Sequence, residues 1–276
     1  MRPVRRFHSA LASMTVALCI GAAKADSPIE LPGSIRQGEM VIGRVPPGSQ
    51  VLIGEREVRV ADDGWFVFGA GRDSTGVQRV EAILPGGRRS SVEVEIEGRE
   101  WRIERVDGLP QSTVTPDPVL AERIGREQAR VIEARKRDDD RTDFLHGFIW
   151  PVEGRVSGVY GSQRILNGTP RNPHYGLDVA VPTGTPLKAP AAGVVIFADP
   201  DLYLTGGTLT IDHGHGISST FIHLSRLDRK VGDRVEQGEI VGAVGATGRA
   251  TGPHMHWGMN WFDVRLDPQL LLPTRP

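Results

Sequence analysis

Short apolar runs, each closed by turn residues, recur along this chain and favour a mainly β fold. The clearest runs of the first third occupy residues 51–53, 58–60, 65–68 and 92–96. The last of these alternates apolar with charged residues, which is typical of a strand with one buried face. Glycine-containing turns separate the runs at 62–64 and 85–87. We therefore expect residues 26–107 to form a small β-sandwich-like domain of unknown role.

The composition changes at about residue 148, where glycine and β-branched residues become frequent. Three segments have strong strand propensity, namely 193–197, 208–211 and 239–242. The glycines near them fit tight turns and close approach of backbones. We expect residues 148–276 to form a second all-β domain of folded-over antiparallel sheets.

The segment between these two regions, 108–147, reads as a linker followed by a helix. Residues 108–116 form the linker, and Asp117 with Pro118 then supplies a capping side chain followed by proline in the first turn. Apolar side chains share one face at helical spacing: Leu120, Ile124 and Val131. The helix ends in the charge run 135–141, which we interpret as solvated surface.

The first 25 residues have the layout of a secretory signal peptide. Three arginines precede the apolar stretch 10–23, and a small-x-small cleavage site follows, ending at Ala25. The only cysteine, Cys19, lies inside this segment, and Leu18 before it is not the small residue that a lipid-anchoring site requires. We expect an exported protein, periplasmic or secreted, without a membrane span, a disulfide or a catalytic thiol in its mature form.

The charge of the chain argues against nucleic acid as a partner. Removing the signal segment takes four cations and no acid, so that 29 Lys and Arg face 34 Asp and Glu and the net charge changes from -1 to -5. Such a chain has no basic excess with which to neutralise phosphates.

Histidine spacing indicates a metal site in the second domain. His174 and Asp178 stand at i and i+4, and His254 and His256 at i and i+2, so each pair shares a face of an extended chain. Two histidines and one carboxylate make up the three-ligand set of a catalytic zinc site, which leaves a position for water. If His174, Asp178 and His256 are the ligands, His254 remains beside the metal without binding it, and His223 can supply a second free imidazole.

Three segments together resemble the signature of the lysostaphin-like (LytM-type) zinc endopeptidases, which cleave peptidoglycan. They are HYGLD at 174–178, DHGHGISSTFIHL at 212–224 and GATGRATGPHMHW at 245–257. The resemblance implies a peptidase domain of the duplicated hybrid type. It also implies one zinc ion per chain, bound by His174, Asp178 and His256, and catalytic imidazoles at His223 and His254.

The same resemblance implies that the substrate is a peptide cross-link of peptidoglycan, and the export signal favours D,D cross-links. In one position the chain departs from the family, which commonly carries an acidic residue where this sequence has Gly258. The contacts from surrounding residues that orient the metal ligands are therefore expected to differ from those in the family. His213 and His215 form another HxH pair, but they stand in a glycine-rich turn without a carboxylate at ligand spacing, and we interpret both as structural.

Two functions from other classes compete with the peptidase. A non-catalytic protein that binds the wall or activates an amidase is one alternative, although this chain has the complete ligand set. A phosphohistidine carrier of the sugar phosphotransferase type is the other. A cytosolic phosphorelay does not fit an exported chain.

Overall fold

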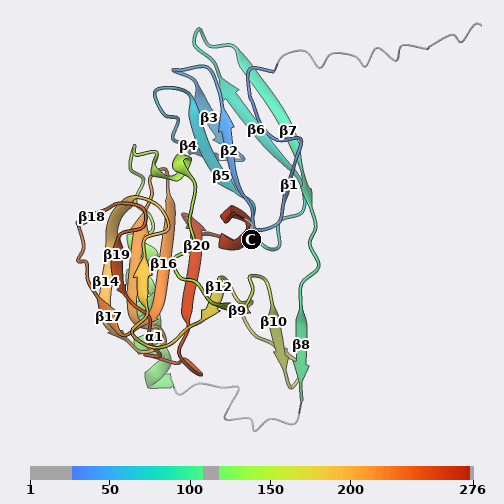
Figure 1. Cartoon of the computed structure of the whole chain (residues 1–276). Coiled ribbons are helices and arrows are strands. Elements are labelled where there is room, and N and C mark those ends of the chain that lie inside the picture. Colours follow the sequence, from blue (N-terminus) through green and yellow to red (C-terminus); the bar gives the residue numbers. More distant parts are fainter. Residues whose placement is uncertain (1–26, 108–117, 274–276) are drawn as a thin grey trace, which may run out of the picture.

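The computed structural model describes residues 27–107 and 118–273 (Figure 1). The signal segment with Cys19, the linker 108–116 and the capping Asp117 lie outside these residues. The described parts are mainly β with one α-helix, which confirms the predicted fold class. None of the helices in them is long and apolar enough to cross a membrane.

Seven strands form the N-terminal unit. They are β1 (Ser34–Arg36), β2 (Met40–Arg44), β3 (Gln50–Ile53), β4 (Arg56–Val58), β5 (Trp65–Gly69), β6 (Gly76–Ile83) and β7 (Arg89–Glu97). Five of them make a sheet in the order β1-β7-β6-β3-β4, and β2 pairs with β5 in a second, two-stranded sheet. The core between the sheets contains large side chains with no exposed surface, including Phe66 and Phe68. Their burial provides most of the driving force for this unit.

The C-terminal unit is built around one large sheet, whose strands run in the order β18-β14-β15-β16-β20-β12-β9, with β21 paired to β20. Their bounds are β9 (Arg155–Gly158), β12 (Leu177–Ala180), β14 (Gly193–Leu202), β15 (Gly206–Asp212), β16 (Ile217–Leu224), β18 (Arg234–Val235), β20 (Met255–Trp261) and β21 (Val264–Leu266). A smaller sheet of β13 (Pro186–Lys188), β19 (Ile240–Ala243) and β17 (Arg226–Leu227) completes the unit. The 3-10 helices η2 (Asp143–His146) and η3 (Pro268–Leu271) flank it.

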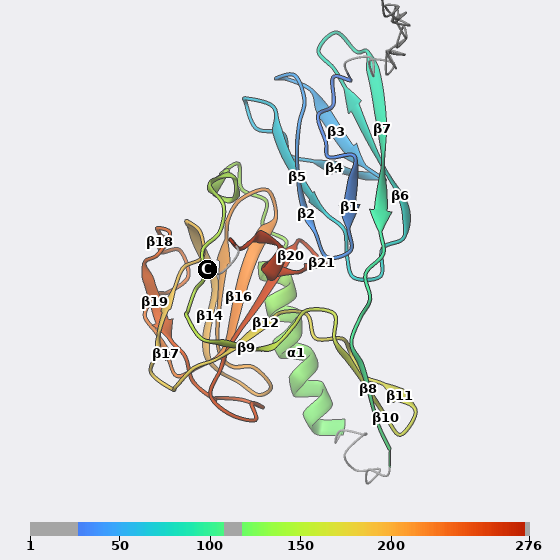
Figure 2. The same ribbon diagram turned by 45° about the vertical axis from the view of Figure 1, so that its right-hand side comes forward.

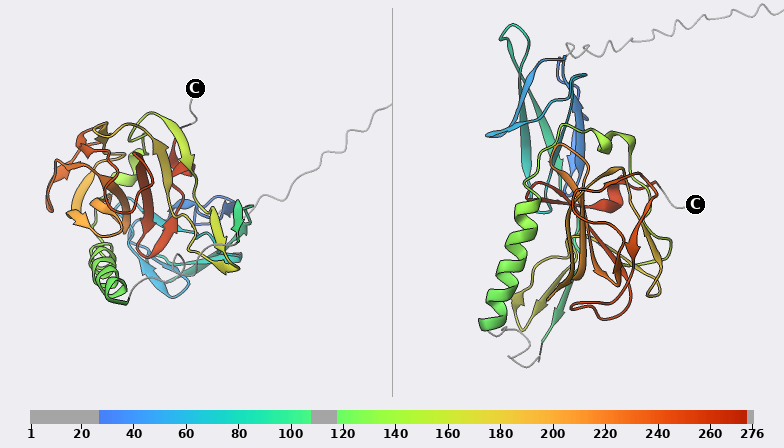
Figure 3. Two further views of the ribbon diagram at one scale, coloured as in Figure 1. Left: turned by 90° about the horizontal axis from the view of Figure 1, so that it is seen from below. Right: turned by 90° about the vertical axis from the view of Figure 1, so that its left-hand side faces the viewer.

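Helix α1 (Pro118–Ala134) lies alongside the large sheet (Figures 2 and 3). Its Arg130 forms an ion pair with Asp199 of β14 at 2.9 Å and places its guanidinium 5.4 Å from the centre of the Phe197 ring. Such contacts between an arginine, a carboxylate and an aromatic face combine charge with packing. They fix the helix against β14.

The connection out of the N-terminal unit pairs with the C-terminal unit. Strand β8 (Ile103–Val106) runs parallel to β10 (Gln163–Leu166), which also pairs with β11 (Thr169–Pro170). Trp101 stands just before β8. The guanidinium groups of Arg72 and Arg99 lie 5.2 and 4.6 Å from the centre of its ring, and Tyr160 meets the same ring edge-on. Segments far apart in sequence are thereby held together at the point where the chain leaves the first unit.

An ion pair with a buried carboxylate also joins the two units. Arg99 donates to the Asp267 carboxylate at 2.8 Å, and the Asp267 side chain is only 2% exposed. Asp267 also accepts a hydrogen bond from the Gln269 backbone at the start of η3. A buried carboxylate that loses its cation is strongly unfavourable, so this pair is expected to stabilise the assembled chain.

We expect Arg99→Ala to lower the free energy of unfolding by about 2 to 3 kcal/mol, because the Asp267 carboxylate would stay buried without its cation. Arg79→Ala is the matched control, since Arg79 pairs with Glu81 on the surface with 59% of its side chain exposed. That change should cost about 0.5 kcal/mol or less. Urea denaturation followed by tryptophan fluorescence measures both, and equal losses would contradict the role of the buried pair.

Candidate metal centre

Two neighbouring strands place a carboxylate opposite an imidazole. In β12, Leu177 and Val179 are fully buried while Asp178 between them points to the other face, and β20 repeats the pattern with His256 between Met255 and Trp257. The antiparallel register pairs Asp178 directly with His256. Directly opposed residues in such a pair have side chains on the same face, about 5 Å apart at Cβ. The pairing therefore forces the two polar groups together above the core.

His174 completes a group of three potential ligands. Its Nε2 lies 3.1 Å from Asp178 Oδ1 and 3.1 Å from His256 Nδ1, and His256 Nδ1 lies 2.8 Å from Asp178 Oδ1. One ligand atom from each of the three residues falls within 4.8 Å of the others. The other His174 nitrogen, Nδ1, is 3.0 Å from the Val159 carbonyl, which orients the ring.

The protonation of Asp178 and His256 suits a cation, whereas the neighbouring carboxylate favours the charged form of His174. Burial alone would raise the pKa of Asp178, but hydrogen bonds from His174 and His256 hold that pKa well below its usual range. Burial lowers the pKa of His256. At His174, burial opposes the charged form, yet the bonds to Asp178 outweigh it and raise the pKa. An ionised carboxylate and a neutral imidazole are the forms that bind metals.

Glycines leave the room that this arrangement needs. A Cβ at Gly158, on the neighbouring strand β9, would come within 2.2 Å of Asp178 Oδ2. A Cβ at Gly176 would come within 2.6 Å of His256 Cε1. Real side chains do not approach so closely, so any larger residue at either position would displace a candidate ligand.

The two remaining imidazoles of the predicted site lie next to each other. The rings of His223 and His254 are 5.0 Å apart, and His254 Nε2 is 4.0 Å from Asp178 Oδ1. Nδ1 of His223 lies 2.8 Å from the Thr247 carbonyl, and Nδ1 of His254 lies 2.8 Å from the Gly252 carbonyl. A carbonyl only accepts, so each Nδ1 donates and each neutral ring keeps Nε2 as an acceptor.

His223 is held in an unusual conformation at the end of β16. Its φ of 64° is in the left-handed region, which non-glycine residues seldom adopt. Its backbone N–H donates to Thr205 at 2.7 Å, and burial lowers the pKa of the imidazole to about 4. Strained backbone of this kind clusters at functional sites. The structure thus brings together all five residues that the sequence analysis singled out.

The other HxH pair has a packing role, as the sequence analysis expected. His213 is fully buried, with Nδ1 at 2.7 Å from the Ala192 carbonyl and Nε2 at 2.9 Å from Ser219 Oγ. Both nitrogens are engaged, and burial lowers the pKa of the ring to about 4. His215 packs against Phe144, with ring centres 5.2 Å apart.

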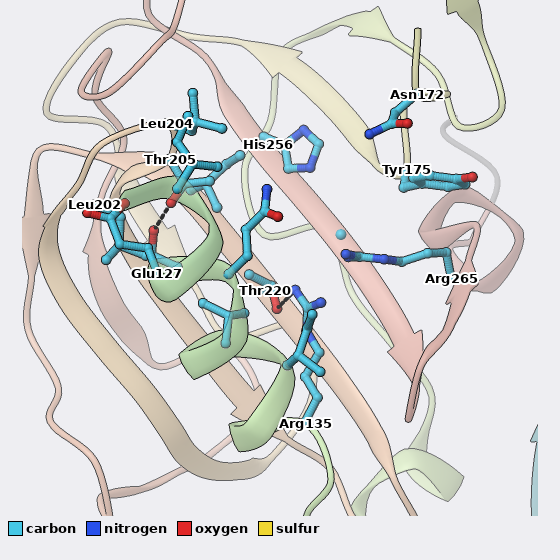
Figure 4. Close-up of a pocket in the computed structure, with 17 residues that line it drawn as sticks. Glu127, Arg135, Asn172, Tyr175, Leu202, Leu204, Thr205, Thr220, His256 and Arg265 are labelled. Atoms are coloured by element: carbon cyan, nitrogen blue, oxygen red, sulfur yellow. Dashed lines mark hydrogen bonds between the residues drawn. The ribbon is translucent and has the colours of Figure 1, made fainter. Parts of the chain in front are cut away.

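A cavity of about 340 Å³ lies between α1 and the sheet face that carries His256; we refer to it as the α1 cavity (Figure 4). Its walls include Ile124, Gln128 and Arg135 from the helix side and Thr220, His256 and Gly258 from the sheet. Gly258 therefore opens onto this space. Arg265 of β21 also lines it.

The interpretation of the charge run 135–141 as solvated surface holds for the exposed residues 136–138 and 140 but was wrong for its two ends. Arg135 is only 8% exposed, and Arg141 forms an ion pair with the buried Asp212. Arg135 follows Ile124 by eleven residues, about three helical turns, so it continues the apolar face of α1. That periodicity was the available signal. For Arg265 the sequence offered no comparable pattern.

Comparison with known proteins identifies a family whose matched segment includes these residues. The model of Peptidase family M23 matches residues 172–268. The peptidoglycan DD-endopeptidase ShyA of Vibrio cholerae is 37% identical over 111 residues, which are 39% of this chain and 26% of that protein. The DD-carboxypeptidase/endopeptidase Mpg of Neisseria meningitidis is 42% identical over 101 residues, 37% of this chain and 22% of that protein. The matches thus span about a quarter of the length of these curated relatives.

One solved structure resembles nearly the whole molecule. It is a crystal structure of a Pseudomonas aeruginosa protein assigned to peptidase M23, with 32% identity and a TM-score of 0.66. The match covers 87% of this chain and 95% of the other, so it includes both units. On this similarity and the match over the histidine motifs, the chain belongs to peptidase family M23.

Proposed function

We propose that this protein is an exported, zinc-dependent endopeptidase that hydrolyses peptide cross-links of peptidoglycan. One observation carries the proposal. His174 Nε2, Asp178 Oδ1 and His256 Nδ1 converge within 4.8 Å of one another, and two further imidazoles stand beside them with Nε2 available. A metallopeptidase needs both parts, a three-ligand metal site and nearby groups that move protons.

The donor set fits zinc. Two imidazole nitrogens and one carboxylate oxygen are borderline ligands of the kind that zinc prefers, whereas magnesium and calcium favour oxygen donors. A zinc ion held by these three residues would supply the Lewis acid that activates water and polarises the scissile carbonyl.

The free imidazoles supply the proton transfers. Water attacks the carbonyl carbon, and Nε2 of either His223 or His254 accepts its proton and returns it to the amine that leaves when the C–N bond breaks. The other ring, once protonated, donates to the oxygen on which negative charge develops. The two carbonyls that fix the Nδ1 protons hold both rings ready for these roles.

The substrate class is supported by the relatives. ShyA is a peptidoglycan DD-endopeptidase and is 37% identical to this chain over 111 residues. The match to the M23 family model, over 172–268, includes the histidine motifs. An exported chain meets peptidoglycan outside the cytoplasm. We therefore extend the proposal to D,D cross-links in a periplasmic or secreted location.

Muropeptide analysis tests the function. Cross-linked sacculi incubated with the zinc-loaded protein should lose dimeric muropeptides and gain monomers, and the product masses identify the bond that is cut. The His174→Ala protein is the blank. Unchanged dimers in the presence of protein with bound zinc would contradict the proposal.

Metal content tests the ligand set separately. The wild-type protein should bind about one zinc ion per chain, whereas His174→Ala should weaken binding by more than the roughly 10- to 100-fold that loss of an outer-shell partner costs. His146→Ala is the control, because His146 is exposed and distant in sequence from the site. Elemental analysis after dialysis measures both, and full zinc content in His174→Ala would exclude this residue as a ligand.

Loss of a proton-transferring imidazole should affect rate and not metal. We expect His254→Ala to retain zinc while turnover falls roughly 10²- to 10⁴-fold, the usual contribution of a general acid or base. Turnover is measured on the purified muropeptide dimer with zinc content determined in the same samples. A variant that keeps the wild-type rate would remove His254 from the mechanism.

A further inference from the structure

The α1 cavity contains two cations that face the same space. Arg135, which follows α1, and Arg265 of β21 both line it, and in Figure 4 their guanidinium groups point toward each other beside the strand that carries His256. The charge on Arg265 contributes to lowering the pKa of Arg135, so the groups are near enough to repel. Two like charges brought together without a carboxylate between them require a compensating interaction.

Arg135 lacks the partners that a buried guanidinium normally has. Its side chain is more than nine-tenths buried. Nη2 donates to Thr220 Oγ1 at 3.2 Å, and Nε has no hydrogen-bond partner. Burial, followed by the Arg265 charge, lowers its pKa to about 9, which still leaves a cation at neutral pH. An unsatisfied buried donor on a charged group costs more than a neutral one, and a ligand can remove that cost.

Arg265 is satisfied only by neutral groups. Its Nη1 donates to Asn260 Oδ1 at 3.3 Å, and its guanidinium lies 5.9 Å from the centre of the Tyr175 ring. Among the described residues, neither Arg135 nor Arg265 has a carboxylate within ion-pair distance. Both side chains line the cavity, and Arg135 Nε has no hydrogen-bond partner within the described part of the protein.

The one acid in the cavity wall is already engaged. Glu127 accepts from Arg123 Nε at 2.7 Å with one oxygen and from the Tyr203 backbone at 2.8 Å with the other. A second cavity, which Arg135 and Arg265 also line, is bordered by Asp263, which is exposed and pairs with Arg56. Neither acid neutralises the arginine pair.

We propose that the α1 cavity binds a carboxylate of the peptide substrate, with Arg135 and Arg265 as its cationic pair. Guanidinium groups match the two oxygens of a carboxylate, and such charge-assisted bonds are stronger than neutral ones. The cavity volume of about 340 Å³ accommodates the end or side chain of a peptide. His256 is both a candidate zinc ligand and a wall of the cavity, so a peptide anchored here lies next to the reacting site. This inference rests on the proposed peptidase function.

Substrate modification tests the proposal without changing the protein. A purified cross-linked muropeptide dimer is compared with the same dimer after its carboxylates have been converted to amides. We expect kcat/KM of the wild-type protein to be about 10-fold or more higher for the carboxylate form, because the amide loses the charge-assisted bonds to the arginines. A factor of ten corresponds to about 1.4 kcal/mol. Equal values for the two dimers would overturn the proposal.

Variants of the cavity arginines test whether the preference for the carboxylate form depends on them. Arg135→Gln and Arg265→Gln should each bring the ratio of kcat/KM for the two dimers close to one, mainly through a higher KM for the carboxylate form. Arg126→Gln is the matched control, because Arg126 is an exposed residue of α1 that pairs with Glu122 and does not line the cavity. A preference that survives in both cavity variants would overturn the assignment, and the amidated dimer reveals whether either variant has merely lost its fold.

A binding measurement separates this proposal from the peptidase function. Acetyl-D-alanyl-D-alanine and its C-terminal amide are titrated calorimetrically into the His174→Ala protein, which keeps the cavity residues. If the acid binds and the amide does not, and if the further change Arg135→Gln abolishes that binding, the cavity is supported as a carboxylate site. This conclusion holds even if no dimer is ever cleaved. Absence of binding by the acid, or equal binding of both peptides, overturns it. Inorganic phosphate forms a third arm, and tight phosphate binding with no preference between the peptides would indicate a free-anion site instead.

Discussion

The pairing of β12 with β20 is the contact on which the site depends. Strand geometry sends alternate side chains to opposite faces, so the same pairing that buries Leu177 and Trp257 directs Asp178 and His256 outward and sets them opposite each other. A shift of one residue in register would bury both polar groups and expose the apolar ones. The free energy of core packing therefore also fixes these two candidate ligands in place.

The same core packing explains how these polar groups can be held so close together while they are only partly exposed. Asp178 lies within hydrogen-bond distance of two imidazoles, and crowding of this kind is tolerable only if the backbone cannot relax. β20 is paired along its length with β16, β12 and β21, and β12 is held on its other edge by β9. Sites built on paired strands are more precise than sites on loops.

Sequence patterns predicted the parts of this molecule that depend on local periodicity. Alternation and turn residues indicated the strands. Spacing linked His174 with Asp178 and His254 with His256, whereas the choice of His174, Asp178 and His256 as one ligand set drew on the family resemblance. His174 itself precedes β12, so it does not share a strand face with Asp178. The parallel pairing of β8 with β10 and the left-handed backbone of His223 were not predictable in this way. Both result from contacts between segments distant in sequence, and no residue type marks them.

Arg135 shows most clearly what the sequence patterns could not predict. A charged residue in a run of charges is usually solvated, and only the docking of α1 on the sheet buries this one. The helix could have ended in an apolar residue at that position, since it continues the face of Ile124 and Val131. Burying a guanidinium opposite a second one is costly, and packing does not require it. The same strand that holds His256 continues through a tight turn into β21 with Arg265, so one rigid hairpin connects the ligand to the cation pair. A charged cavity wall joined so directly to a reacting centre is better explained by recognition of an anionic substrate group than by stability.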